Sequence, residues 1–256
     1  MEEKPYNARQ FFDSWYSSAL NAGEFSDRIT LSPNYTNLMM KYHYNLVENL
    51  IIEFLHDKNI SKPNILDIGS GTGHWLEFYH QLYPDAKIIG LDISEVAVKQ
   101  LNKKLKNKNI EVMCFDISKS FNPGINFHIV NAIGVMFHIV EDIQWENAIE
   151  NISKVLVEGG YFIVSGKFGE TSENVQRHAS DNFKSWDERK KLWEEIQNKK
   201  NEVVLVNKRI RSLKYWIKTA AKYNLYPVDF MKQPKLNKIK TPENNLLVFI
   251  KESPNL

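Results

Sequence analysis

Apolar and polar residues follow one another in regular blocks through the middle of this 256-residue chain. Short apolar runs, typical of buried parallel strands, are separated by longer segments with helical spacing. We expect the strands at residues 65–68, 87–91, 110–115, 127–132 and 161–165. Strands that alternate with helices in this way indicate a parallel sheet with helices on its faces. The pattern therefore predicts a doubly wound α/β fold.

Residues that start and stop helices mark the connections between these strands. Ser94 is a good N-cap for a helix that runs to about Lys106. The lysines of this helix are expected to form a solvated face rather than a nucleic-acid patch. Glu158-Gly-Gly160 is expected to close the preceding helix and open the fifth strand.

The segments on either side of this core have other patterns. Residues 6–60 look helical, and their apolar positions recur at spacings of three and four. An upstream aromatic cluster is expected to pack in the core or, alternatively, to cover a ligand; its members are Phe11, Phe12, Trp15 and Tyr16. Residues 167–201 are polar and charged with one helical stripe, so they predict an insertion that forms a lid or a substrate wall.

The remaining residues return to the core pattern. A short apolar run covers 203–206, a helix begins after Ser212, and strand-like pieces follow at 225–231 and 246–250. Without a clear linker, we expect one domain over residues 1–256. Its parts would be an N-terminal helical cap at 1–60, a ligand-binding core at 61–166, the lid-like insertion at 167–201 and a C-terminal part of the core at 202–256.

Composition narrows the class of protein. Hydrophobic residues make up 43% of the chain, as in a packed globular protein, and the net charge of +2 does not call for a nucleic-acid partner. No apolar run approaches the ~20 residues that span a bilayer, and the N-terminus lacks the pattern of a secretory signal. The lone Cys114 excludes a disulfide framework and a cysteine-based zinc cluster. We expect a cytoplasmic protein without a metal site.

Candidate chemistry begins where the first strand ends, in Asn64-Ile-Leu-Asp-Ile-Gly-Ser-Gly-Thr-Gly-His74. Three glycines at alternate positions, Gly69, Gly71 and Gly73, allow backbone dihedrals that other residues avoid and let a ligand approach the main chain. A strand, such a turn and a helix are how α/β sheets hold cofactors that contain a nucleoside.

Two cofactor classes compete for this turn. The dinucleotide fingerprint G-x-G-x-x-G needs its third glycine at position 74, which is His74. Asp67 just before the turn would repel a pyrophosphate but suits a cation. The D-x-G-x-G-x-G pattern at 67–73 resembles the first motif of class I S-adenosylmethionine-dependent methyltransferases, whose cofactor carries a sulfonium and an ammonium and has no phosphate.

The stretch from Asn131 to Gly160 strengthens the resemblance, because it is similar to the later motifs of that family. The likeness covers about residues 60–166 well and the C-terminal end loosely, where 243–249 resembles the final antiparallel strand of the family. The N-terminal helices and the insertion are hardly covered. His128 stands where the family usually has an acid on strand four.

The resemblance implies roles for a set of residues at the strand ends. Asp92 and Ile93 would hold the ribose and one face of the adenine, and Asp116 and Ile117 would bind the adenine edge. Asp67 would anchor the amino end of the methionine moiety. The cofactor-binding residues implied are Asp67, Gly69, Gly71, Gly73, Asp92, Ile93, Asp116, Ile117, Asn131 and Phe137. Four polar strand ends (67, 92, 116 and 131) would meet at one sheet edge.

Methyl transfer from a sulfonium is an in-line displacement that depends mainly on placing the acceptor. His138 is the candidate base, since it follows the fourth strand and its free pKa is near neutrality. A packing role for His138 stays open, and His43, Tyr35 and Tyr42 are weaker candidates. Arg209 and Arg211 could contact an acidic substrate or RNA, but a solvated face is the favoured interpretation.

The sequence therefore predicts a methyltransferase that acts on an oxygen or nitrogen of a small molecule and yields S-adenosylhomocysteine. Asn131-Ala-Ile-Gly134 lacks the Asn- or Asp-Pro-Pro-aromatic segment used on nucleobase amines, and Cys114 lies inside a strand, away from a nucleophile's place. A cofactor-binding scaffold without catalysis and an NAD-dependent oxidoreductase remain as alternatives. The acceptor and the oligomeric state are left open.

Overall fold

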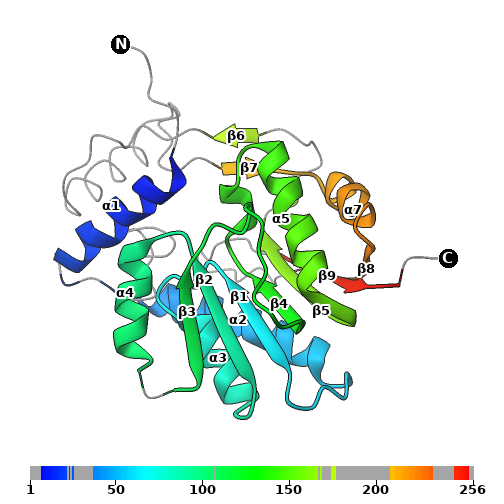
Figure 1. Ribbon diagram of the computed structural model, residues 1–256, viewed down its shortest axis with the longest axis horizontal. Coiled ribbons are helices and arrows are strands. Elements are labelled where there is room, and N and C mark those ends of the chain that lie inside the picture. Colours follow the sequence, from blue (N-terminus) through cyan, green and yellow to red (C-terminus); the bar gives the residue numbers. More distant parts are fainter. Residues whose placement is uncertain are drawn as a thin grey trace.

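A seven-stranded sheet with strand order β3-β2-β1-β4-β5-β9-β8 forms the centre of the molecule (Figure 1). The computed structural model describes residues 7–21, 23, 25, 37–106, 108–166, 168, 174–176, 208–232 and 245–253. The strands of the large sheet are β1 (Asn64–Ile68), β2 (Lys87–Asp92), β3 (Ile110–Cys114), β4 (Phe127–Ala132), β5 (Leu156–Gly166), β8 (Leu225–Met231) and β9 (Asn245–Lys251).

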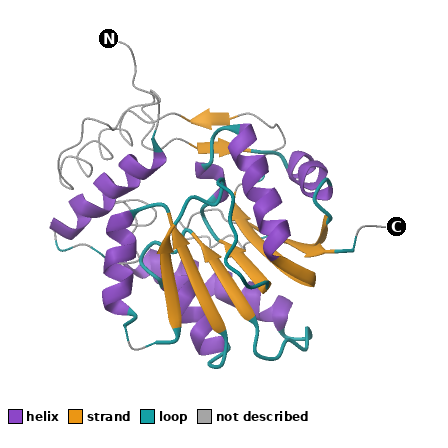
Figure 2. Cartoon of the chain, in the orientation of Figure 1, coloured by secondary structure: helices purple, strands orange, loops and turns teal. Residues whose placement is uncertain are grey.

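The first five strands are parallel, and β9 runs antiparallel between β5 and β8. Helices cover both faces of the sheet (Figure 2). They are α1 (Ala8–Asn21), α2 (Asn37–Leu55), α3 (His74–Leu82), α4 (Glu95–Lys104), α5 (Asp142–Val155) and α7 (Leu213–Ala221). The predicted doubly wound fold with an antiparallel C-terminal strand is confirmed.

Side chains alternate between the two faces of each strand and so divide the core in two. Leu66 and Ile68 of β1 belong to the core under α5 and α7, whereas Ile65 belongs to the core under α2, α3 and α4. Asp67 shares the parity of Ile65. Its carboxyl group is therefore directed to the α3 face, where it is completely buried.

One helix boundary differs from the sequence prediction. Glu158-Gly-Gly160 does not close a helix, because α5 ends at Val155 and Leu156 already pairs with Phe127 in β4. The next registered pair joins Ile129 to Tyr161. Residues 157–160 thus form a bulge inside β5, and Gly159 takes the positive φ of +75° that such an irregularity requires.

The described part of the insertion includes a strand, and the helical stripe predicted farther along the insertion lies outside the described residues. Residues Asn174–Gln176 form β6, which pairs antiparallel with β7 (Lys208–Ile210). Both lie at the same end of the sheet as α1 (Figure 1). The rest of the predicted lid and the apolar run at 203–206 lie outside the described residues. The division of the chain at 60, 166 and 201 stays a prediction.

Candidate active site

A cavity opens at the carboxyl ends of β1 and β2, where ligands bind in open α/β sheets. Its empty volume is about 1050 Å³ when the open mouth is counted. Two sets of residues surround it. We call residues 68–72, 74, 92–93 and 115–117 the strand edge, and we call Phe12, Tyr16, His43, Tyr44 and His138 the aromatic wall.

The glycine turn forms the floor of the cavity. The backbone N–H groups of Gly69 and Ser70 both donate to Leu91 O, at 2.7 and 2.9 Å, which ties the turn to the end of β2. Gly69 has a φ of +72°, and a Cβ there would lie 2.2 Å from Cγ2 of Val135. Only glycine fits this position, since both its backbone conformation and the space beside it exclude a side chain.

Asp92 lines the cavity at the end of β2 and organises the turn beside it. Its Oδ2 accepts from Gly71 N at 2.8 Å and its Oδ1 from Ser94 N at 2.9 Å. Burial raises the pKa of Asp92 to about 6, and the hydrogen bonds from the backbone oppose that shift. The carboxylate therefore presents fixed acceptor oxygens at the cavity, as the sequence predicts for a group that binds hydroxyls.

Asp67 lies behind the turn and is not among the residues that line the cavity. Its Oδ1 accepts from Asn131 Nδ2 at 2.6 Å, and Asn131 Oδ1 accepts from the Tyr79 hydroxyl at 3.2 Å. Within the described residues, Asp67 Oδ2 is buried without a hydrogen-bond partner. Burial raises the pKa of Asp67 to about 7. A buried carboxylate at the turn favours a cation nearby, because a cation would stabilise its charged form.

The far end of the strand edge comes from residues just beyond β3. Asp116, Ile117 and Ile93 all line the cavity. Asp116 Oδ1 accepts from Ser118 N at 3.0 Å and from Ser118 Oγ at 2.7 Å, which makes it a turn residue as well. Three more of the predicted residues lie away from the lining: Gly73, Asn131 and Phe137. The binding roles of all these residues stay predictions.

The aromatic wall faces the strand edge across the cavity. Phe12 and Tyr16 come from α1, His43 and Tyr44 from α2, and His138 from the short helix η2 (Met136–His138). The His138 ring meets the Phe12 ring edge to face, with centroids 5.2 Å apart. All four aromatic residues of the cluster predicted from the sequence pack together with Ala97 of α4, and two of them, Phe12 and Tyr16, also line the cavity.

Two residues of the wall have strongly shifted pKa values. Burial and the nearby Asp92 raise the pKa of Tyr16 well above its ordinary value. Burial, assisted by the charge of His74, lowers the pKa of His43 to about 4, so His43 is neutral at pH 7. His74 in turn pairs with Glu48, with Nε2 and Oε1 2.9 Å apart, and stacks on Tyr44 with centroids 3.6 Å apart.

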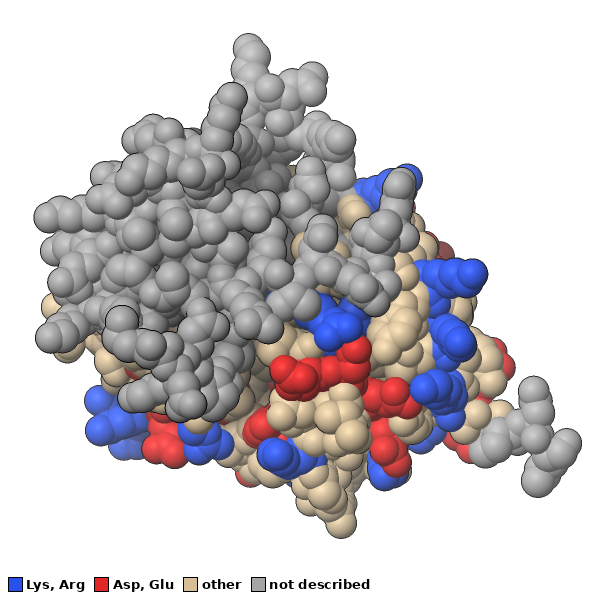
Figure 3. Space-filling view, turned by 90° about the horizontal axis from the view of Figure 1, so that it is seen from above, with Lys and Arg blue, Asp and Glu red and all other residues tan. Residues whose placement is uncertain are grey.

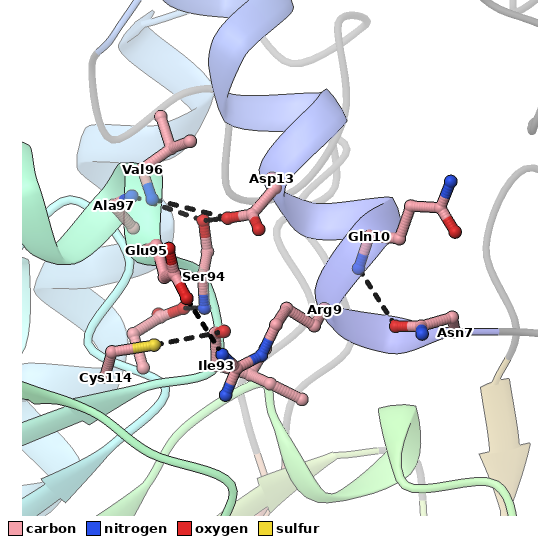
Figure 4. Close-up of polar contacts among 11 residues, drawn as sticks. Asn7, Arg9, Gln10, Asp13, Ile93, Ser94, Glu95, Val96, Ala97 and Cys114 are labelled. Atoms are coloured by element: carbon pink, nitrogen blue, oxygen red, sulfur yellow. Dashed lines mark hydrogen bonds and ion pairs between the residues drawn. The ribbon is translucent and has the colours of Figure 1, made fainter.

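Polar contacts hold α1 over the cavity (Figure 4). Asp13 Oδ1 accepts from Ser94 Oγ at 2.6 Å and from Val96 N at 3.3 Å, and Arg9 pairs with Glu95 at 3.0 Å. Ser94 is the N-cap of α4, and its own N–H donates to Asp92. The helix that carries part of the aromatic wall is therefore fastened to the turn that carries Asp92.

Sequence reasoning did not identify Tyr44 or His74 as site residues, and it gave the cluster that contains Tyr16 a ligand-covering role only as the alternative to core packing. Tyr44 and His74 stack on each other from α2 and from the start of α3, two elements far apart in the sequence. The one local signal was the position of His74, directly after the third glycine of the turn.

The surface charges correct one expectation. Basic and acidic side chains lie next to one another on the described part of the face in Figure 3, as the low net charge suggests. The predicted solvated face is nevertheless wrong for Arg211, which is 2% exposed, and Arg209 pairs with Asp142 at 2.6 Å.

Cys114 does not have the surroundings of a reactive thiol. Its thiol donates to Ile93 O, and burial raises its pKa.

Within the described ranges, no group of three or more His, Cys, Asp and Glu side chains is arranged to hold a metal ion. In the same part of the chain, we find no helix with the length and apolar character needed to cross a bilayer.

Comparison with known proteins agrees with the fold and the position of the turn. Residues 65–160 match the model of a family described as "Methyltransferase domain". The chain is 28% identical over 148 residues to carboxy-S-adenosyl-L-methionine synthase of Helicobacter pylori (strain P12), a match that covers 56% of this chain and 58% of that protein. It is 30% identical to ribosomal protein L11 methyltransferase of Staphylococcus epidermidis, over 44% of this chain and 35% of that one. The chain thus spans little more than half the length of the first relative and about a third of the length of the second.

Solved structures extend the likeness over nearly the whole fold. The crystal structure of 1,6-didemethyltoxoflavin-N1-methyltransferase from Burkholderia thailandensis, with its acceptor and S-adenosylhomocysteine bound, superposes with a TM-score of 0.62 at 14% identity. The match covers 98% of this chain and 93% of that one. The fold is that of a Rossmann-like methyltransferase. Through residues 65–160, the chain is similar to the family described as "Methyltransferase domain".

Proposed function

We propose that this protein transfers a methyl group from S-adenosylmethionine to an oxygen or nitrogen of a small-molecule acceptor. The observation that carries the proposal is the cavity itself. A glycine turn and the carboxylates of Asp92 and Asp116 line one side, and aromatic side chains line the other. The match of residues 65–160 to the methyltransferase domain supports the same assignment.

The residues present fit this cofactor better than a dinucleotide. Asp67 is buried behind the glycine turn with one oxygen unpartnered among the described residues, which suits an ammonium or sulfonium and repels a pyrophosphate. In the proposed complex, Asp92 accepts hydrogen bonds from the ribose hydroxyls. Ile93 packs on the adenine, and Asp116 accepts from its amino group through the oxygen that does not bond Ser118.

Bound S-adenosylmethionine supplies a methyl group on a positively charged sulfur. The protein contributes placement, because an in-line displacement is fast only when the acceptor atom lies about 3 Å from the methyl carbon and opposite the sulfur. The aromatic wall excludes water and orients a flat or apolar acceptor between α1, α2 and η2. His138 lines the same space and takes the proton of an acceptor hydroxyl or ammonium.

Calorimetry tests the cofactor assignment. Titration of the intact chain with S-adenosylmethionine, S-adenosylhomocysteine and NAD should give one micromolar site for the first two, corresponding to about −8 kcal/mol, and no heat for NAD. Binding of NAD without binding of the methionine-derived ligands would favour the oxidoreductase alternative and overturn the proposal.

A methyl-transfer assay tests the acceptor. The chain is incubated with S-adenosylmethionine carrying a labelled methyl group and with separate pools of small metabolites and of ribosomal proteins. We expect label in the small-molecule pool. Label in the protein pool would retain the reaction but replace the acceptor class. Tight cofactor binding without transfer to either pool would favour a non-catalytic scaffold.

The His138→Ala variant tests the proton-transfer role. We expect turnover to fall at least about tenfold while affinity for S-adenosylhomocysteine changes less than about threefold. His56→Ala, at an exposed position on the end of α2, serves as the control. Unchanged turnover in His138→Ala would remove this side chain from the mechanism and leave it a packing residue against Phe12.

A further inference from the structure

Arg211 directly follows β7, in the segment where the chain returns from the insertion. Its side chain connects this segment to the loop after η2. Its guanidinium makes four hydrogen bonds. Nη1 donates to Ile139 O at 3.1 Å and Nη2 to Val140 O at 3.2 Å, while Nε and Nη2 donate to Asp142 Oδ1 at 3.1 and 2.9 Å. The guanidinium also lies over the Trp145 ring, 4.3 Å from its centroid. The side chain is therefore held from every side inside the protein.

A buried arginine is costly unless its donors are satisfied, so its contacts indicate its role. Asp142 alone would satisfy the charge, and Arg209 already pairs with the other oxygen of that carboxylate at 2.6 Å. The two bonds to the carbonyl groups of residues 139 and 140 are the distinctive ones. These carbonyls lie between η2 and α5, where no regular element supplies their donors.

Those two carbonyls belong to the backbone that immediately follows His138. His138 and Ile139 both line the cavity. The His138 ring contacts Phe12 of α1 and its neighbour Phe137. Arg211 binds the carbonyl groups of the two residues that follow His138, so it holds the backbone from which the imidazole projects.

We propose that Arg211 is a positioning residue that fixes the backbone after His138 and so sets the acceptor end of the cavity; this inference rests on the proposed function. Because Arg211 adjoins β7, it also links the returning insertion to that end. A lysine keeps the positive charge but lacks the planar fork that can reach two carbonyls and a carboxylate together. The substitution Arg211→Lys can therefore separate the contribution of the positive charge from that of the guanidinium geometry.

The experiment compares Arg211→Lys with Arg209→Lys by NMR of the intact chain labelled with ¹⁵N-histidine, with S-adenosylhomocysteine as the cofactor probe. We expect Arg211→Lys to shift or broaden the His138 ring resonances and to move their titration midpoint, while affinity for S-adenosylhomocysteine changes less than about threefold. Arg209 binds the same carboxylate as Arg211, so Arg209→Lys is the matched control. It should leave the His138 resonances as they are in the wild type. Unaltered His138 resonances in a folded Arg211→Lys variant would overturn the inference.

A second variant covers the case in which Arg211→Lys does not fold. Asp142 has a side chain that is 40% exposed, so Asp142→Asn is expected to fold while it weakens the hold on the guanidinium. It should move the His138 resonances in a milder way, and no movement there would again overturn the inference. Failure of the proposed function is distinguishable, because it would appear as absent binding of S-adenosylhomocysteine to the wild-type chain.

Discussion

The strand edge and the aromatic wall enclose the same cavity but are built in different ways. The strand edge consists of turns whose polar atoms bond to neighbouring backbone, as Asp92 does with Gly71 and Ser94. The aromatic wall consists of rings brought from α1, α2 and η2 by packing and a few polar contacts. The residues of the strand edge can be replaced only if the backbone of the turns moves, whereas each ring of the aromatic wall can be replaced by itself. Cofactor recognition is therefore expected to be rigid and acceptor recognition adjustable.

The largest effect should come from the glycine turn. Gly69→Ala would place a Cβ 2.2 Å from Val135, so we expect a loss of about 2–4 kcal/mol in the free energy of unfolding and about a hundredfold weaker cofactor binding. Gly124→Ala is the matched control, because its φ of +71° is nearly the same and nothing lies within 4 Å. It should cost about 1 kcal/mol and leave binding unchanged. Denaturant unfolding and calorimetry measure both, and equal effects in the two variants would contradict the steric argument.

Asp92 should show the next largest effect. In Asp92→Asn an amide N–H₂ replaces an oxygen that accepts from a backbone N–H, and the hydroxyl-binding charge is lost. We expect affinity for S-adenosylhomocysteine to fall about thirtyfold or more, or about 2 kcal/mol, in calorimetry. Asp85→Asn is an exposed control that should bind normally. Retention of wild-type affinity in Asp92→Asn would show that the strand edge does not hold the cofactor at this residue.

Asp67 predicts a pH dependence of binding. Its pKa is raised to about 7 in the folded protein, so a cationic ligand that favours the carboxylate must displace a proton at lower pH. Affinity for S-adenosylhomocysteine should therefore rise about three- to tenfold from pH 6 to pH 8 and then level off. In Asp67→Asn the dependence should disappear. Calorimetry across this range checks the trend, and pH-independent binding by the wild type would exclude contact between the ligand charge and Asp67.

The raised pKa of Asp67 also makes the stability of the folded chain depend on pH. The folded chain keeps a proton on Asp67 that the unfolded chain releases near its ordinary pKa, so this group's favourable contribution is present below about pH 4 and is lost as the pH rises to about 7. At pH 8 the buried charge opposes folding. Asp67→Asn should thus raise the melting temperature at pH 8 more than at pH 5, and the reverse order would contradict the assigned pKa.

The smallest effect should come from the attachment of α1, where the two polar contacts differ in burial. Asp13→Ala removes a partly buried acceptor of two hydrogen bonds and should cost about 1 kcal/mol in unfolding free energy. Arg9→Ala removes an exposed ion pair and should cost less than about 0.5 kcal/mol. Hydrogen exchange of α1 should follow the same order. Equal exchange in both variants would mean that the aromatic packing of Phe11 and Trp15 alone holds this helix.

The two regions also differ in how far sequence reasoning could reach. The strand edge depends on residues that are close to predicted strands in the sequence. The glycines, Asp92 and Asp116 directly follow such strands, so the strand periodicity and the turn residues are enough to predict that they lie near one another. The fold was predictable for the same reason. The aromatic wall is not local, since Tyr44 and Phe12 meet the cavity only through the packing of α1 and α2. The burial of Arg211 could not be predicted, because its partners Asp142 and Trp145 lie about seventy positions away in the sequence.

The position of β9 has a consequence for the order in which the chain can assemble. β9 lies between β5 and β8, although it follows both of them in the sequence. During synthesis β8 therefore emerges before its partner and cannot join the sheet, while β5 keeps an open hydrogen-bonding edge. Residues 245–251 pair with β5 and β8 together, so a large gain in cooperativity is expected when this segment leaves the ribosome.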